Sequence, residues 1–404
     1  MPDLNPAKST WLYQLLFEGP WPTAVAFVGE RRIAAGNREG QLLVWDLPAP
    51  GSKDEPPKDV PADDKKKDKK SDEPPSVPPV RMLKGHDNGV TRLVALPDGK
   101  TLISASLDHT VRIWDLDATP TGEAEVIVDA ETREREAKRG NKTALGAPGV
   151  KVQVQQAAHI LQGHRDWVHA LNTSRDGKRL ISGDDSNLTI VWDLASGKQV
   201  SQWTGYEGNS VTSAALSPDG KRAFVADYCA SRGDYDRPPA HAKFFSADDG
   251  SEKLDFLVVQ FPKDKPENSY GYAQKWGKLM ARGFVAADFS PDGKLVAAGM
   301  GGETDTGKVH LIDTESAKLV RTVAGHQYGV CDLMFSPDGK FILSCGRDTT
   351  VQVTSVEDGK EAAKLGKPRG GQFKDWLNAI ALSPDNTWLA AADIAGFVQV
   401  WKLG

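Results

Sequence analysis

Three sets of residues in this 404-residue chain have the side-chain types that nucleophilic catalysis uses. Each set combines a histidine, a serine and an acidic residue: His86, Ser104 and Asp108; His164 and Ser182 with Asp184 or Asp185; His326, Ser344 and Asp348. An imidazole that takes a proton from a serine hydroxyl, oriented by a carboxylate, is the arrangement of a hydrolase triad. The trio recurs in a fixed frame, however, and we therefore favour a structural role over catalysis.

Other chemistries find less support. The eight histidines have no HExxH or comparable spacing, which argues against a metal site. The stretch GMGGETDTGK at 299–308 lacks the full GxxxxGK[ST] pattern and no helix is expected after it, so we expect no nucleotide cofactor. Cys229, Cys331 and Cys345 are odd in number and show no CxxC spacing, which indicates reduced core thiols.

Charge and hydropathy exclude further classes. The 50 Lys+Arg and 55 Asp+Glu residues give a net charge of −5, which disfavours a nucleic-acid partner. The sequence has no run of about 18 apolar residues, so we expect no membrane span. The first 20 residues lack the basic-then-apolar layout of a secretory leader, so we expect a cytoplasmic protein, monomeric when alone.

A repeat organises the chain. The distance from the histidine to the position that holds Trp114 or Trp192 is 28 residues in three segments: 86 to 114, 164 to 192 and 326 to 354. Weaker copies start near residues 21, 209, 282 and 376, which gives seven. Each copy alternates short β-branched and apolar runs with turns such as Pro-Asp-Gly, and this pattern predicts four short antiparallel strands per copy. No long 3.6-residue periodicity is present, so we expect very little helix.

A lone four-stranded sheet cannot bury both faces, whereas sheets arranged radially around an axis bury each face against the next. The residues that mark the copies are Gly85-His86 with Trp114-Asp115, Gly163-His164 with Trp192-Asp193, Gly325-His326, and Trp45-Asp46. On these motifs the chain resembles the WD-repeat (WD40-type) β-propeller family over nearly its whole length. The resemblance implies an all-β, seven-bladed propeller of four-stranded antiparallel blades, and we expect the strand at 11–17 to close the last blade.

The resemblance also gives the histidine sets a role, because in the family a His, Ser, Asp and Trp form a hydrogen-bonded chain inside the blade. Blade two has the full set: His86, Ser104, Asp108 and Trp114. Blade three has His164, Ser182 and Trp192 but Ser186 at the Asp position, which leaves Asp184 or Asp185 as the substitute. Blade six has His326, Ser344 and Asp348, with Thr354 at the Trp position.

We expect one propeller domain over 1–404, with blades at 18–83, 84–161, 162–203, 204–259, 260–323, 324–366 and 367–404. Residues 48–79, rich in Pro, Lys and Asp, form an insertion in blade one that we expect to be disordered. A second insertion at 117–157, in blade two, contains EVIVDAE and VKVQVQQA, which could pair as an extra hairpin. Both insertions are expected on the bottom face.

The top face carries the candidate binding residues. Trp21, Trp167 and Trp376 share one repeat position, just before the innermost strand, where blades two, five and six have Gly. Long loops of blades four and five add a second group: Tyr235, Arg237, Tyr272 and Trp276. Tyr, Trp and Arg dominate binding hot spots, although these side chains could equally pack their own loops onto the rim. Asp166 and Asp375 precede two of the tryptophans, so we expect a ligand that carries Lys or Arg.

The function expected from these features is a non-enzymatic scaffold that presents its top face to a protein or peptide partner. Two alternatives remain open. One is a propeller enzyme with an active site at the channel mouth, and the other is a scaffold subunit of a larger complex without its own ligand.

Overall fold

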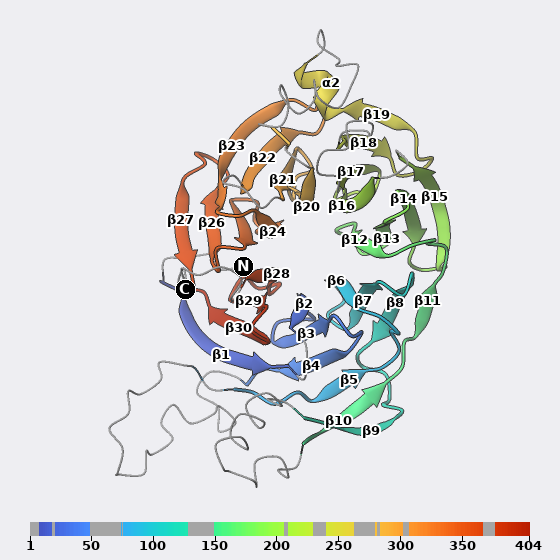
Figure 1. Cartoon of the computed structure of the whole chain (residues 1–404), viewed down its shortest axis with the longest axis vertical. Coiled ribbons are helices and arrows are strands. Elements are labelled where there is room, and N and C mark those ends of the chain that lie inside the picture. Colours follow the sequence, from blue (N-terminus) through green and yellow to red (C-terminus); the bar gives the residue numbers. More distant parts are fainter. Residues whose placement is uncertain are drawn as a thin grey trace.

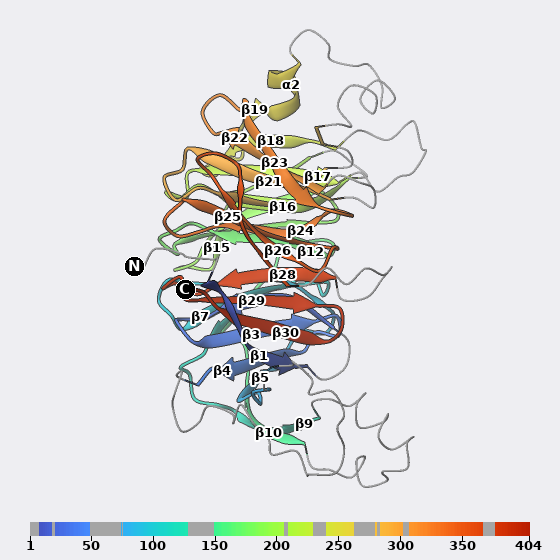
Figure 2. The ribbon, with the colours of Figure 1, turned by 90° about the vertical axis from the view of Figure 1, so that its left-hand side faces the viewer.

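The strands are arranged as a ring of sheets around a central axis. The computed structural model describes residues 8–17, 21–48, 74, 76–127, 149–205, 209–228, 240–261, 279–280, 283–301, 307–366 and 376–404. Within these ranges the strands form seven sheets, and the one α-helix is the short α2 (Phe256–Gln260). Figure 1 shows the ring face-on, and Figure 2 shows it from the side as a flattened body. The seven-bladed all-β fold is confirmed.

Each blade runs from an innermost strand beside the axis to an outermost strand at the rim. The strands of blades one to three, from the axis outwards, are β2 (Pro22–Phe27), β3 (Arg32–Asn37), β4 (Leu42–Asp46) and β5 (Arg81–Leu83); β6 (Val90–Ala95), β7 (Thr101–Ser106), β8 (Val111–Asp115) and β11 (His159–Leu161); β12 (Val168–Thr173), β13 (Arg179–Asp184), β14 (Leu188–Asp193) and β15 (Lys198–Thr204).

The later blades repeat the order, and the last takes its fourth strand from the N-terminus. Their strands are β16 (Ser210–Leu216), β17 (Arg222–Tyr228), β18 (Ala242–Ser246) and β19 (Glu252–Asp255); β20 (Phe284–Phe289), β21 (Leu295–Met300), β22 (Gly307–Asp313) and β23 (Leu319–His326); β24 (Val330–Phe335), β25 (Phe341–Gly346), β26 (Val351–Ser355) and β27 (Glu361–Leu365); β28 (Leu377–Leu382), β29 (Trp388–Asp393), β30 (Phe397–Lys402) and β1 (Thr10–Leu16).

Burial follows the position of a strand in its blade. In the second strand β7 every residue after Thr101 is buried, because both faces of this strand meet neighbouring blades. The outermost strand β15 is exposed or half-buried along its whole length. On the third strands, Trp45, Trp114 and Trp192 are among the largest fully buried side chains. The core therefore lies between blades, as several clusters around the axis.

One insertion changes the strand count of a blade. β9 (Gly122–Val126) and β10 (Val150–Gln155) pair antiparallel, which is the hairpin expected within 117–157. We expected this hairpin to belong to blade two. The structure instead pairs β10 in parallel with β5, so the sheet of blade one has six strands. Figure 1 shows β10 and β9 outside β5 at the rim. Blade one therefore has the four expected strands and, at the exposed edge of β5, two strands more.

The expected disorder of 48–79 lies mostly outside the described residues. At the end of the insertion, residues 76–79 are described, and Val77 is buried in the same apolar cluster as Trp45. Burial of this side chain anchors the segment that leads into β5.

The ring closes through the two ends of the chain. β1 pairs antiparallel with β30, from Thr10 opposite Lys402 to Leu16 opposite Phe397. Tyr13, Leu15 and Phe17 are buried among residues of blades seven and one, and Phe17 packs against Trp45 with ring centroids 5.8 Å apart. Ladder hydrogen bonds and apolar burial together join the first and last repeats, which confirms closure by the N-terminal strand.

Blade five has a different internal link around His310, which is 1% exposed. Its Nε2 lies 2.6 Å from the carbonyl oxygen of Leu279, and its Nδ1 lies 2.8 Å from the hydroxyl of Thr322. Because a carbonyl only accepts, Nε2 carries the proton and the Thr322 hydroxyl donates to Nδ1. Burial lowers the pKa of His310 to about 4, so the neutral ring is the stable form in the fold.

Truncation of the Leu15 side chain should weaken the closure of the ring by β1. Leu15→Ala removes a fully buried side chain from the blade seven–blade one interface, and we expect the free energy of unfolding to fall by about 2–5 kcal/mol in denaturant titrations. Thr10→Ala, at the exposed start of the same strand, is the control and should stay within about 0.5 kcal/mol of the wild type. Equal stability of both variants would show that β1 does not hold the ring closed.

The pKa of His310 predicts acid sensitivity. A histidine whose folded pKa lies below its unfolded value stabilises the fold above the unfolded pKa, and this contribution is lost as the pH falls toward the folded value. Between pH 7 and pH 4 we expect the wild type to lose about 3 kcal/mol more unfolding free energy than His310→Gln, as measured by denaturant titration at each pH. Parallel pH profiles for the two proteins would contradict this assignment.

Candidate functional site: the mouth of the central channel

A β-bulge near the start of every innermost strand positions one side chain toward the axis. The pairing register skips one residue in each of the seven blades, and we call these residues the inner ring: Thr23, Thr91, His169, Thr212, Val285, Cys331 and Asn378. A bulged residue has no ladder partner and bends the strand, so its side chain is re-aimed. All seven residues line one cavity of about 630 Å³.

The inner ring also ties neighbouring blades together. Four of its side chains donate to the carbonyl of the residue just before the bulge in the next blade: Thr23 to Val90, Thr91 to Val168, Thr212 to Phe284 and Asn378 to Pro22. The Thr212 and Asn378 bonds measure 2.8 and 3.0 Å. These hydroxyl and amide groups donate their hydrogen bonds to backbone carbonyls. The contacts that hold the blades side by side therefore also fix the inner-ring side chains in position.

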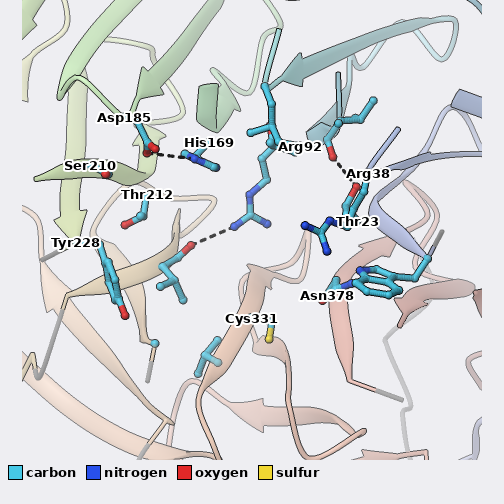
Figure 3. Close-up of a pocket in the computed structure, with 18 of the residues that line it drawn as sticks. Thr23, Arg38, Arg92, His169, Asp185, Ser210, Thr212, Tyr228, Cys331 and Asn378 are labelled. Atoms are coloured by element: carbon cyan, nitrogen blue, oxygen red, sulfur yellow. Dashed lines mark hydrogen bonds and ion pairs between the residues drawn. The ribbon is translucent and has the colours of Figure 1, made fainter. Parts of the chain in front are cut away.

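A second ring lies above the first. Its members share one repeat position, which directly follows the second strand of each blade, except in blade four, where it is the last residue of β17. We call this set the outer ring: Arg38, Leu107, Asp185, Tyr228, Gly301, Arg347 and Ile394. The first six of these line the same cavity. The loops concerned join the second and third strands, which identifies this opening as the top face. Figure 3 shows Arg38 on one side of the opening and Asp185, His169 and Tyr228 on the other, with the side chain of Arg92 between them.

Polar side chains narrow the channel below the mouth. Arg92 of β6 reaches across the axis, where Nη1 lies 3.1 Å from Asp332 Oδ1 of β24 and Nη2 lies 3.1 Å from the carbonyl oxygen of Val285. Deeper, Asp288 accepts from the backbone of Phe335, and burial raises the pKa of this carboxyl to about 7. A ligand that enters from the top therefore meets the Arg92–Asp332 pair as a floor.

At the bottom end of the channel, one side chain bridges the turns of three blades. Arg175 lies in the turn of blade three where blades two, four, five, six and seven have proline. Its guanidinium donates to the carbonyls of Pro291 and Pro337, each at 3.2 Å. These prolines belong to the corresponding turns of blades five and six. One arginine thus bridges three blades at the end of the channel opposite the cavity.

The three tryptophans stand around the mouth with unequal exposure. Trp21 and Trp167 are exposed to 36% and 45% of their surface, while Trp376 is half-buried. Trp21 lines the cavity and lies under the Arg38 guanidinium, 5.2 Å from its Cζ. Trp376 lies under Arg347 at 4.6 Å. The four loop residues of the sequence expectation, Tyr235, Arg237, Tyr272 and Trp276, lie outside the described residues.

The charge of the mouth is opposite to the sequence expectation. The cavity is lined by three arginines, Arg38, Arg92 and Arg347, and by one carboxylate, Asp185, which pairs with His169 at 3.1 Å. Burial opposes ionisation of Asp185, but the hydrogen bond to His169 lowers the pKa of this carboxyl. Asp166 accepts from the adjacent backbone N–H of Trp167, and Asp375 lies outside the described residues. A preference for a Lys- or Arg-bearing ligand is therefore not supported by the described residues.

The histidine sets form hydrogen-bonded chains inside their blades. In blade two, His86 contacts Asp108 and Ser104, both at 2.7 Å, and the Trp114 indole donates to Ser104 at 2.9 Å. Asp108 is held ionised: burial opposes this, yet hydrogen bonds from His86 and Thr110 bring the pKa of the carboxyl far below its usual range. Burial lowers the pKa of His86, which disfavours the charged ring.

Blade three shows which acid replaces the missing one. His164 contacts Asp184 at 2.9 Å and Ser182 at 2.6 Å, and Trp192 donates to Ser182 at 2.8 Å. Asp185 instead faces the mouth as part of the outer ring. Of these two adjacent aspartates, Asp184 therefore has a structural role inside the blade and Asp185 lies at the surface of the mouth.

Blade six has the same chain without the indole: His326 contacts Asp348 at 2.9 Å and Ser344 at 2.8 Å. Ser104 and Ser182 are fully buried and Ser344 is 3% exposed, so substrate has no access to these hydroxyls. The three sets therefore stabilise blades and form no open triad.

Two further kinds of site are absent from the described ranges. No group of three or more His, Cys, Asp or Glu side chains there could hold a metal ion. No helix in the same ranges is long and apolar enough to cross a membrane. Cys331 lines the mouth, and burial raises the pKa of its thiol to about 11, so it stays protonated at neutral pH.

Comparisons with known proteins fit this architecture. Four segments, at 77–115, 155–193, 317–355 and 367–402, match the family model described as "WD domain, G-beta repeat". The Nuclear distribution protein nudF of Aspergillus niger is 24% identical over 70% of this chain and 43% of its own length. A WD repeat-containing protein 55 homolog of Drosophila melanogaster is 35% identical over 28% of this chain and 22% of its own. The 77 kDa echinoderm microtubule-associated protein of Strongylocentrotus purpuratus is 25% identical over 57% and 34%. The chain spans less than half the length of these relatives.

Removing inner-ring hydroxyls should loosen the blade contacts. The double variant Thr91→Val and Thr212→Val retains side-chain shape but leaves two carbonyls of neighbouring blades without their donors. Each lost bond costs about 1 kcal/mol, so we expect a loss of about 2 kcal/mol in unfolding free energy. The matched control, Thr→Ser at both positions, keeps the donors and should remain near the wild type. If the valine and serine variants unfold together, the inter-blade bonds do not stabilise the ring.

Proposed function

Because this chain belongs to the WD40-type family of β-propellers, we propose that it is a non-enzymatic scaffold that binds a peptide or loop of a partner protein at the mouth of its channel. The observation that carries the proposal is the cavity of about 630 Å³ to which all seven blades contribute, bordered by exposed indoles. This volume lies within the range of sites that enclose a ligand.

Exposed tryptophans are the main support for a protein partner. Indoles bury a large area at low cost in side-chain entropy and are enriched in binding hot spots. Trp21 and Trp167 are exposed on turns, whereas the other large indoles of the repeats, such as Trp114 and Trp192, are buried. We propose that the loops carrying Tyr235, Arg237, Tyr272 and Trp276 extend the same surface, since Tyr228, at the start of the first loop, lines the cavity.

The lining residues favour binding over catalysis. His169 pairs with Asp185 at 3.1 Å, and no bond joins His169 to a serine or cysteine in the described part of the mouth. A nucleophile needs a general base within hydrogen-bond reach, and the neutral Cys331 thiol has none among these residues. We therefore retain the expectation of a cytoplasmic, non-enzymatic binding protein that is monomeric until it meets its partner.

Truncation of the two exposed indoles tests the proposal. Trp21→Ala with Trp167→Ala should change the unfolding free energy by about 1 kcal/mol or less, because both side chains are exposed. We expect it to weaken binding of the native partner tenfold or more, first by affinity capture with quantitative mass spectrometry and then by calorimetry with the purified partner.

The control removes equally exposed apolar side chains at the rim: Ile160→Ala with Val320→Ala, which are 48% and 56% exposed in the wild type. This variant should bind like the wild type. Undiminished capture by the tryptophan variant would reject the mouth as the binding surface, and would favour a scaffold subunit that assembles through another face.

A further inference from the structure

The outer ring is electrostatically uneven, and this unevenness identifies the chemistry of the partner. Its two cations, Arg38 in blade one and Arg347 in blade six, flank blade seven, and Arg92 of blade two projects beneath them. The opposite half, from blades three to five, presents Asp185, Tyr228 and Gly301, and Asp185 lies 3.1 Å from His169. One half of the mouth is therefore cationic although the whole chain carries a charge of −5.

Arg38 and Arg347 are available to a ligand. In the ranges that the structure describes, neither guanidinium lies within 4 Å of a carboxylate, unlike Arg92, which pairs with Asp332. Each instead lies over an indole, Trp21 or Trp376. An indole face attracts the cation without neutralising it, so the charge and the N–H donors can serve an incoming anion.

Two acids next to the outer ring in sequence, Asp348 and Asp108, form hydrogen bonds within their own blades. Asp348, next to Arg347 in sequence, binds His326 and Thr350, and burial is offset by these bonds so that the pKa of the carboxyl is lowered. Asp108 is bound to His86 in the same way. The hydrogen-bonded chains that stabilise the blades thus remove acids that could neutralise the mouth.

The turns that carry the two arginines are well defined. Asn37 Oδ1 accepts from the backbone N–H groups of Glu39 and Gln41, both at 3.0 Å, and this fixes the turn that contains Arg38. Asp348 plays the matching part after Arg347, since it accepts from the side chain of Thr350 at 2.9 Å. Cations on fixed turns lose little conformational freedom when they bind, which strengthens selection for charge.

We propose that the partner docks through an acidic segment, whose Asp or Glu carboxylates pair with Arg38 and Arg347 while its apolar side chains lie against Trp21 and Trp376. This inference rests on the proposed function and adds the chemistry of the ligand. A peptide fits better than a nucleic acid, because the described part of the mouth has two arginines without a carboxylate partner and the overall charge opposes a polyanion. Planar guanidinium groups match carboxylates through two parallel hydrogen bonds.

The test selects peptides from a displayed library of random dodecamers on the intact wild-type protein. We expect the selected sequences to be enriched in Asp and Glu and depleted in Lys and Arg. The leading peptide is then synthesised, together with a counterpart in which Lys replaces each acid, and binding is measured beside that of a single-stranded dT12 oligonucleotide. The acidic peptide should bind at least tenfold more tightly than either probe, with an affinity that falls as salt rises.

Charge-matched variants assign the effect to the two arginines. Arg38→Gln with Arg347→Gln should weaken the acidic peptide about tenfold or more. Arg31→Gln with Arg165→Gln removes the same charge from two exposed arginines that do not line the cavity, and should change binding less than twofold. Melting curves of all variants report whether each is folded.

The outcomes separate this inference from the function on which it rests. Selection of neutral or basic peptides, whose binding is lost in the Trp21→Ala and Trp167→Ala variant, would overturn the acidic partner but leave the mouth as a peptide site. Tighter binding of dT12 would overturn it in favour of a nucleic acid, and selection of no peptide would overturn it outright. Native-partner binding that survives loss of the mouth tryptophans and of both arginines would reject the proposed function and this inference with it, even if acidic peptides were selected.

Discussion

A single backbone irregularity, the bulge in every innermost strand, sets both the stability of the ring and the shape of its mouth. It turns one side chain per blade toward the axis, where four of these side chains hold the carbonyl of the next blade. The same residues line the cavity. Contacts between blades and the ligand surface therefore share residues, and substitutions at the inner ring change both together.

Stability is distributed unevenly among blades. Blades two, three and six contain polar chains centred on His86, His164 and His326. In blade one, Ala35 stands where those blades have serine, and the buried indole N–H of Trp45 has no acceptor among the described residues. That blade relies instead on apolar packing with β1 and on the strands added at its outer edge. Packing thus substitutes for hydrogen bonds where the sequence lacks them.

Much of the fold could be predicted because the repeat carries it in local patterns. The 28-residue frame, the turn residues and the unpaired N-terminal strand were sufficient for seven blades and their closure. The partner of the hairpin β9–β10 could not be predicted, because which free edge lies nearby depends on the assembled ring. The charge of the mouth does not follow from the residues beside the tryptophans, Asp166 and Asp375. Arg38 and Arg347 determine it, and they share a different repeat position, directly after the second strand.

The hairpin at the rim has a mechanical consequence. The chain leaves β8 of blade two, adds β9 and β10 to blade one, and only then returns to complete blade two with β11. The side chain of Gln155 in β10 also donates to the carbonyl of Asp115 in β8. The outer strand of blade two cannot detach without pulling on blade one, so these two blades are coupled through the chain itself in addition to their side-chain contacts. Under force or heat, unfolding of the ring would therefore begin at blades other than one and two, which the hairpin β9–β10 links.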